Sequence, residues 1–184
     1  MAKQFDGFTD DHRAFIADQH LFFVGTAADV GRVNISPKGM DSLRVLGPNR
    51  LIWRNLTGSG NETAAHTAAH NRMTLMWCGL EKRPLVLRAY GSVTTLHPRD
   101  PAFAGFNAEF PPSNGARQIF DVAIDMVQTS CGWAIPFYEH AGPRDVLAQW
   151  AENKGPEGIQ THWDTKNQHS IDGLPTYISA DKDA

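Results

Sequence analysis

The sequence has few cysteines, no long hydrophobic run and no excess of positive charge. Its two cysteines, Cys78 and Cys131, cannot form the disulfide framework of a small secreted protein. The longest apolar runs are far shorter than the roughly 20 residues that a membrane-spanning helix needs. Residues 1–15 contain no continuous apolar segment of the kind found in secretory signals. These absences predict a cytoplasmic protein with no membrane partner.

Charge and motifs exclude further classes of protein. Seventeen Lys and Arg residues stand against 20 Asp and Glu, a net charge of −3, whereas general nucleic-acid binders are usually strongly basic. The sequence has no GxGxxG motif that opens a βαβ unit and no GxxxxGK[ST] motif, so the Rossmann and P-loop classes are not expected. It also lacks the GxSxG elbow of serine hydrolases. We therefore predict no nucleic-acid partner and assign no catalytic residue.

The length and the local patterns predict one domain over residues 1–184, with a helical and irregular extension over about 143–184. A helix should begin at Thr9, and an alanine-rich helix should cover 61–70. A short helix is expected within 98–120. Strands are predicted over 21–26, 32–36, 51–55, 72–78, 84–95 with Gly91 as a bulge, and 121–130 with a continuation over 133–136. Most connections are too short for parallel crossovers, which favours a small antiparallel barrel.

The segment LTGSGNET (56–63) is the most informative candidate site. Gly58 and Gly60 allow a ligand to approach the backbone closely, and the segment opens a helix whose first N–H groups lack helical partners. Such a helix start binds anions, typically phosphate. An alternative needs no ligand, because Ser59 and Glu62 have the spacing of a capping box.

Other candidate residues are weaker when taken singly. Lys38, between Pro37 and Gly39, could face a phosphate or an electron-rich ring, or it could be a solvated lysine in a turn. Trp53 and Arg54 alternate across a strand, so one of them should face inward or toward a ligand; for Trp53 the alternative is core packing. His66 and His70 share a helix face, but with no third ligand they are interpreted as a surface or interface pair. We predict no metal site, and we expect both cysteines to be small buried hydrophobes.

Several of these segments together resemble a known family. Residues 33–39 (VNISPKG), 44–46 (RVL) and 56–66 (LTGSGNETAAH) are similar to the pyridoxamine 5′-phosphate oxidase-like, FMN-binding split-barrel family. Residues 127–132 with Pro136, and 166–167 with 170–175, resemble a later strand and the tail of one bacterial subgroup. The resemblance extends from about Phe22 to Pro175.

The resemblance implies a mainly β fold with flanking helices, a split β-barrel of the FMN-binding type. It also implies a homodimer that holds FMN at its interface. The strand that ends in Lys38 would follow the flavin, Trp53 to Asn55 would lie by the ring or ribityl chain, and the start of the second helix would hold the phosphate. The implied cofactor-binding residues are Asn34, Ser36, Pro37, Lys38, Trp53, Arg54, Asn55, Gly58, Ser59, Gly60, Asn61, Gln128 and Ser130.

The sequence also departs from the true oxidases of that family. They carry Arg and Lys where this chain has Gly60 and Asn61, and residues 172–175 (DGLP) lack their arginine. Glu62 is unfavourable beside a phosphate unless Arg54 or another cation offsets it. We therefore expect an FMN-dependent oxidoreductase of an unknown small molecule, or a flavin or NAD(P)H reductase, rather than a pyridoxamine phosphate oxidase. The alternatives are a non-catalytic flavin store or sensor, a haem binder with His66 or His70 as axial ligand, and a deazaflavin reductase.

Overall fold

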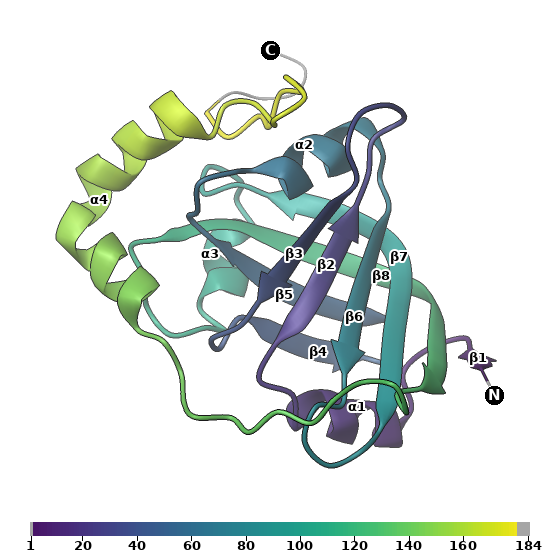
Figure 1. Cartoon of the computed structure of the whole chain (residues 1–184). Helices are drawn as coiled ribbons and strands as arrows, with labels where there is room; N and C mark the ends of the chain where they lie inside the picture. The colour runs from purple at the N-terminus through teal and green to yellow at the C-terminus, as the bar shows by residue number, and fades with distance from the viewer. Residues whose placement is uncertain (1, 180–184) are drawn as a thin grey trace.

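The computed structural model describes residues 2–179 of the chain. Its centre is an antiparallel eight-stranded sheet that curls into a barrel (Figure 1). The strands lie in the order β3-β2-β6-β7-β8-β5-β4, and β1 pairs with the end of β8. Their bounds are β1 Lys3–Phe5, β2 Phe22–Thr26, β3 Asn34–Lys38, β4 Leu43–Gly47, β5 Arg50–Leu56, β6 Met73–Cys78, β7 Leu85–Leu96 and β8 Ala116–Cys131. The mainly β split-barrel prediction is confirmed.

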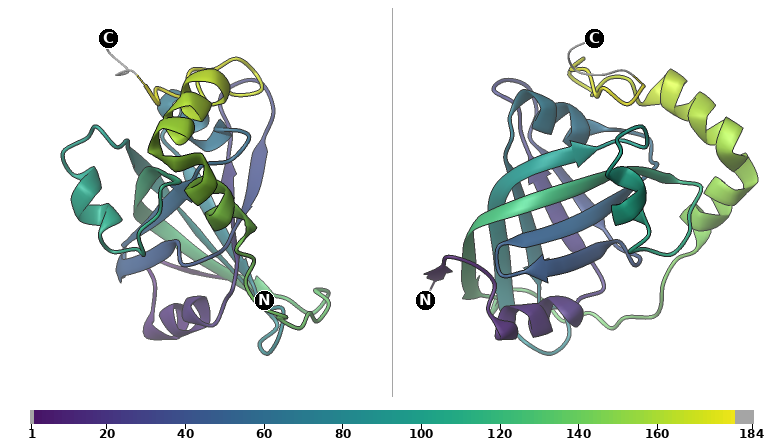
Figure 2. Two further views of the ribbon diagram at one scale, coloured as in Figure 1. Left: turned by 90° about the vertical axis from the view of Figure 1, so that its left-hand side faces the viewer. Right: turned by 180° about the vertical axis from the view of Figure 1, so that it is seen from behind.

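Four helices flank the barrel in the part of the chain that the structure describes. They are α1 (Asp10–Ala17), α2 (Glu62–Ala69), α3 (Phe103–Asn107) and α4 (Val146–Lys166). α1 and α2 lie at opposite ends of the barrel, and α4 arches outside it toward the tail beside α2 (Figures 1 and 2). No helix within residues 2–179 is long and apolar enough to cross a membrane.

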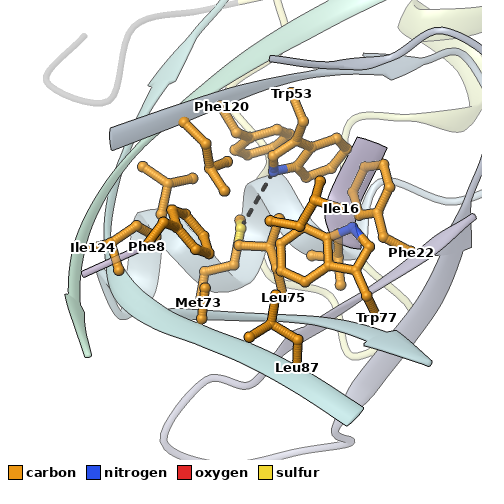
Figure 3. Packing of buried hydrophobic residues seen from close by; sticks show 14 of the residues in the cluster. Phe8, Ile16, Phe22, Trp53, Met73, Leu75, Trp77, Leu87, Phe120 and Ile124 are labelled. Carbon is orange, nitrogen blue, oxygen red and sulfur yellow. Dashed lines mark hydrogen bonds between the residues drawn. The ribbon is translucent and has the colours of Figure 1, made fainter. Parts of the chain in front are cut away.

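The barrel interior holds the main hydrophobic core, because alternate residues of each strand point inward. β2 and β6 alternate between buried and partly exposed positions along their length. Trp53, which is 0% exposed, stacks on Phe120 with 4.5 Å between ring centroids, and its indole N–H contacts the sulfur of Met73 at 3.3 Å (Figure 3). A second cluster outside the sheet joins Ile52 and Ile119 to Phe103 of α3 and to Phe110.

Most predicted elements are confirmed. Thr9 caps α1, and its hydroxyl accepts from the backbone N–H of His12 at 3.2 Å. The bulge at Gly91 is also present: the β7–β8 register shifts there, and a Cβ on Gly91 would lie 2.1 Å from the carbonyl oxygen of Ala123. Only glycine permits this close approach of two strands.

Other details of the prediction were wrong. β1 and β4 were missed, since each is short and becomes a strand through pairing with β8 or β5. β8 begins at Ala116 instead of 121. The continuation over 133–136 does not form, because the chain turns at Gly132, whose carbonyl accepts from the N–H of Ile135, and the Trp133 side chain is 84% exposed.

The C-terminal extension packs against the barrel near the start of α2. α4 bends at Gly155, where φ is +63°, and Pro156 follows. Its second half buries Ile159 and Trp163 in a small cluster with Ile178. The indole N–H of Trp163 donates to the hydroxyl of Thr57 at 2.8 Å. This bond fixes α4 to the loop that precedes α2.

Candidate functional site

A cavity of about 320 Å³ lies where β5 ends and α2 begins, and we call it the α2 pocket. The ends of three elements and one loop form it: β3, β5, the start of β8 and the loop before α2. Its lining residues are Asn34, Ser36, Lys38, Asn55, Leu56, Gly58, Ser59, Gly60, Asn61, Glu62, Thr63 and Arg117. Most of the residues predicted to bind a cofactor therefore come together in one place.

The capping-box interpretation of this segment is wrong. The N-cap of α2 is Asn61, whose side chain makes no capping bond. The carboxylate of Glu62 instead accepts from the backbone N–H of Ile171 in the C-terminal tail, at 3.1 and 3.0 Å. Within residues 2–179, the backbone N–H groups from Gly58 to Thr63 donate no hydrogen bond. The start of α2 therefore retains several free donors.

The carbonyls of the same loop are held by side chains from distant parts of the chain. The amide nitrogen of Asn167 donates to the carbonyls of Gly58 and Ser59 at 3.2 and 3.4 Å. Arg117 Nη1 donates to the carbonyl of Gly60 at 2.9 Å. The acceptors of the loop are thus occupied while its donors remain available, as an anion site requires.

Arg117 is a buried cation without an acidic partner among the described residues. Leu56 pairs with Ala116 and Asn55 with Gln118, so Arg117 is the extra residue of a β-bulge. Its side chain is 3% exposed and bonds to the neutral oxygens of Gly60, Asn167 and Gln118, and no salt bridge involves it among the described residues. Burial lowers the pKa of the Arg117 guanidinium, which nevertheless stays protonated at neutral pH.

Lys38 supplies a second cation to the α2 pocket. Its ammonium lies 3.3 Å from the amide oxygen of Asn55 and 5.3 Å from the centre of the Trp53 ring. Burial, and then the nearby Arg117, lowers the pKa of Lys38 to about 8. Two positive charges that repel each other in a buried pocket favour a bound anion. The solvated-turn interpretation of Lys38 is therefore wrong.

A buried amide network fixes these groups in place. Asn55 donates to Gln118 at 2.9 Å, and Gln118 donates to the side chain of Asn61 at 3.2 Å. Asn61 in turn donates to the main-chain oxygen of Asn167 at 3.3 Å. Because each member is bonded, the loop and both cations are held rigidly before any ligand binds.

Trp53 and Arg54, both predicted to bind the cofactor, lie outside the α2 pocket. Trp53 is fully buried in the core, so it has no exposed surface for a ligand. Its ring packs beneath the ammonium group of Lys38. Arg54 extends to the opposite face of β5, where it donates to the carbonyl of Pro111 at 2.6 Å and covers the ring of Phe110. Arg54 therefore does not line the α2 pocket, whose cations among the described residues are Lys38 and Arg117.

A larger cavity of about 850 Å³, the α4 groove, adjoins the α2 pocket. The two cavities share Lys38, Asn55, Leu56, Gly58 and Ser59. The rest of its lining is Pro37, Gly39, Met40, Ser42, Arg54, Thr57 and Arg144, together with Val146, Leu147, Trp150 and His162 of α4. The two cavities therefore lie side by side and share one wall.

Gln128 and Ser130 do not join either cavity of their own chain. They lie on β8 ten and twelve residues beyond Gln118, a path of up to about 33–40 Å along the curled strand at the usual rise per residue. There Tyr90 donates to Gln128 at 3.3 Å and Arg88 donates to Ser130 at 3.2 Å. Within one chain these residues therefore lie apart from the α2 pocket and the α4 groove.

The histidines and cysteines were partly mispredicted. His66 is buried and its ring lies 3.2 Å from the hydroxyl of Thr26, so it forms no surface pair. His70 follows the end of α2 and pairs with Asp29. Cys78 is half-buried but Cys131 is exposed, which corrects its expected burial. No cluster of metal-ligating side chains occurs within residues 2–179.

Arg117 and Gln118 are site residues that sequence reasoning missed, and the role of Asn167 in holding the loop was missed as well. Arg117 and Gln118 were assigned to an irregular stretch before the last strand. The only signal was the pair of polar residues directly before the apolar pair Ile119 and Phe120. A β-bulge at this position turns the side chains of two neighbouring residues to the same side of the strand. Asn167 entered the sequence analysis only through the resemblance of residues 166–167 to the tail of one subgroup; its contact with the loop was not predicted, since its partners are about a hundred residues away.

The fold and the pocket define a split β-barrel protein with a preformed pocket lined by cations and free N–H groups. The family model described as pyridoxamine 5′-phosphate oxidase matches residues 8–131. The chain is also 33% identical to the pyridoxamine 5′-phosphate oxidase family protein ustO of Aspergillus flavus, over 97% of this chain and 79% of that protein. The chain belongs to the pyridoxamine 5′-phosphate oxidase family.

Solved structures share the fold at lower identity. A Lactobacillus delbrueckii protein provisionally described as a pyridoxamine 5′-phosphate oxidase superposes with a TM-score of 0.54 at 17% identity, covering 67% of this chain and 94% of that one. A variant of HupZ from Group A Streptococcus gives 0.52 at 18% identity, covering 66% and 98%. These likenesses show the fold.

Proposed function

We propose that this protein binds FMN, with the phosphate in the α2 pocket, and that it is an FMN-dependent oxidoreductase. The observation that carries the proposal is the pairing of half-buried Lys38 with buried Arg117, two cations without a carboxylate partner among the described residues, beside the free N–H groups that begin α2. A phosphate dianion would neutralise both cations and accept from these donors. Membership of the pyridoxamine 5′-phosphate oxidase family, and the resemblance of residues 33–39 and 56–66 to its FMN-binding members, support a flavin.

Each residue of the α2 pocket would have its own role in binding FMN. Arg117 and the N–H groups of residues 59–61 would hold the phosphate, with the hydroxyls of Ser36, Ser59 and Thr63 lining the same pocket. Arg117 thus replaces the cations that Gly60 and Asn61 do not provide. Glu62 lines the pocket as well, but the N–H of Ile171 engages its carboxylate. When bound, FMN supplies the hydride and electron transfer.

The proposal includes a cytoplasmic homodimer with FMN at its interface. Gln128 and Ser130 do not line the pocket of their own chain, so a second copy would give them their role in binding FMN. In such a dimer β8 of one protomer would face the cofactor of its partner. A mass measurement in solution, with and without FMN, tests the dimer directly.

The absorption spectrum of the purified protein tests the cofactor. We expect the two visible bands of a bound flavin, or their appearance when FMN is titrated into colourless protein. Oxidation of NADH or NADPH by the loaded protein would support the enzyme, whereas bound FMN that neither donor reduces would favour a store or sensor. Protein that takes up no FMN, or that shows a Soret band, would contradict the proposal.

Lys38 predicts how the affinity for FMN depends on pH. A bound phosphate favours the charged ammonium, so it raises the pKa of Lys38 above the value of about 8 in the free protein. Affinity should therefore be full below about pH 8 and fall by up to tenfold per pH unit above it. Below about pH 6 it should fall again, as the phosphate dianion takes up a proton and becomes a monoanion.

Titration of FMN by fluorescence quenching between about pH 5 and about pH 10 checks this dependence. The Lys38→Met variant serves as the comparison: it should bind FMN more weakly at neutral pH and lose the decline above about pH 8. A wild-type affinity that stays constant from neutral to alkaline pH would show that Lys38 does not contact the anion.

A further inference from the structure

We propose that the α4 groove is the substrate site and that it takes an organic anion with a flat apolar body, such as an aromatic carboxylate. The inference rests on the proposed function, because it places substrate beside the cofactor whose phosphate the α2 pocket would hold. The two cavities share Lys38, Asn55 and Leu56, so their contents would lie against each other. The groove of about 850 Å³ is large enough for a small organic molecule.

The charge of the groove selects an anion. Its lining contains Lys38, Arg54 and Arg144 and no acidic residue among the described residues. Arg54 is 5% exposed, and its Nε has no hydrogen-bond partner within residues 2–179. Burial lowers the pKa of Arg54, and the carboxylate of Asp41, which acts on Arg54 from a distance, is paired with Arg44. A carboxylate in the groove would supply the negative charge that this wall lacks.

The opposite wall selects an apolar body. Val146, Leu147 and Trp150 of α4 line the groove together with Met40, and the Val146 side chain is 69% exposed. Exposed apolar side chains that gather along one cavity mark a surface that an apolar ligand covers. An aromatic ring between Trp150 and Met40 would bury these groups while its carboxylate reached the cations.

The wall made by α4 lies outside the part of the chain that the family model matches. That match ends at residue 131, whereas Arg144, Leu147 and Trp150 lie beyond it. The barrel would therefore supply the anion site, and the extension would choose the substrate. This division is typical of folds that vary their chemistry through loops and additions around a constant scaffold.

Calorimetric titration of 2-naphthoate, with its uncharged analogue 2-naphthamide as the matched ligand, tests the groove. In FMN-loaded protein we expect 2-naphthoate to bind at least about tenfold more tightly than the amide, as loss of a charge-assisted bond predicts. Trp150→Ala should weaken 2-naphthoate by about tenfold, and Arg144→Gln by roughly two- to fivefold, since Arg144 is exposed. Trp133→Ala, which removes an exposed tryptophan that lines neither cavity, should have no effect.

Three outcomes would overturn the inference: equal binding of acid and amide, no binding of either, or one-to-one competition between 2-naphthoate and FMN in cofactor-free protein. Competition would assign the groove to the cofactor itself. The same titration in cofactor-free protein separates this inference from the proposed function. Binding of 2-naphthoate by a protein that takes up no FMN would retain the anion groove and reject the flavin. Uptake of FMN without binding of 2-naphthoate would do the reverse.

Discussion

Replacing Arg117 with methionine is expected to weaken FMN binding by roughly 10- to 100-fold. Arg117 is the most deeply buried cation of the α2 pocket, and its bonds within the chain go to neutral oxygens. A phosphate would give it its first anionic partner, and a hydrogen bond between charged groups contributes about 1.5–3 kcal/mol. Methionine fills a similar volume without charge, so the anion would lose this bond while the cavity stays filled.

The measurement is a titration of FMN followed by fluorescence, with thermal unfolding of each variant as a check on folding. Arg117→Lys should lie between wild type and Arg117→Met, because it keeps the charge but cannot reach several oxygens at once. Arg13→Met is the matched control, since Arg13 is half-exposed on α1 at the other end of the barrel and pairs with Asp10. If a folded Arg117→Met protein bound FMN as tightly as wild type, Arg117 would have no part in holding the phosphate.

Replacing Asn167 with aspartate is expected to weaken FMN binding by a similar factor, through a different cause. The amide oxygen of Asn167 lies 2.7 Å from Arg117 Nη1, so a carboxylate there would neutralise the guanidinium. It would also place a negative charge beside the incoming phosphate, and the buried surroundings would screen this repulsion poorly. An anion that is built into the chain would thus compete with the anion of the ligand.

Two companion variants separate charge from structure. Asn167→Ala removes the bonds to Arg117, Gly58 and Ser59 without adding charge, so it should cost roughly 2–4 kcal/mol of stability and weaken FMN binding less than the aspartate does. Asn153→Asp adds the same charge on the exposed side of α4 and should change neither property. Calorimetry with FMN and thermal unfolding give both readouts. Weaker FMN binding by the alanine than by the aspartate variant would contradict the competing-charge explanation.

The barrel was predictable because its strands carry local signals. The alternation along residues 22–26 and 73–78 and the glycine at 91 each depend on a few neighbouring residues. β4 and β1 were not predictable in this way. Their residues have weak patterns, and they become strands only because β5 and β8 provide hydrogen-bonding partners.

The candidate site was predictable in part for the same reason. Gly58, Ser59 and Gly60 form one continuous loop before a helix, so an anion site could be inferred from consecutive residues of the sequence. The roles of Trp53 and Arg54 could not, because alternation says that they face opposite ways but not which face carries the ligand. The structure places the core on one side and Phe110 on the other.

The sequence by itself therefore determined the family, the barrel and the glycine-rich start of α2, since each depends on local order along the chain. The tertiary structure alone decided which cation serves that loop and what holds it. Arg117 enters the pocket through a bulge that exists only in the pairing of β5 with β8. Asn167 reaches the loop across more than a hundred residues of intervening chain, because α4 folds back over the barrel. Contacts of such separation depend on how the elements pack, and no local pattern records them.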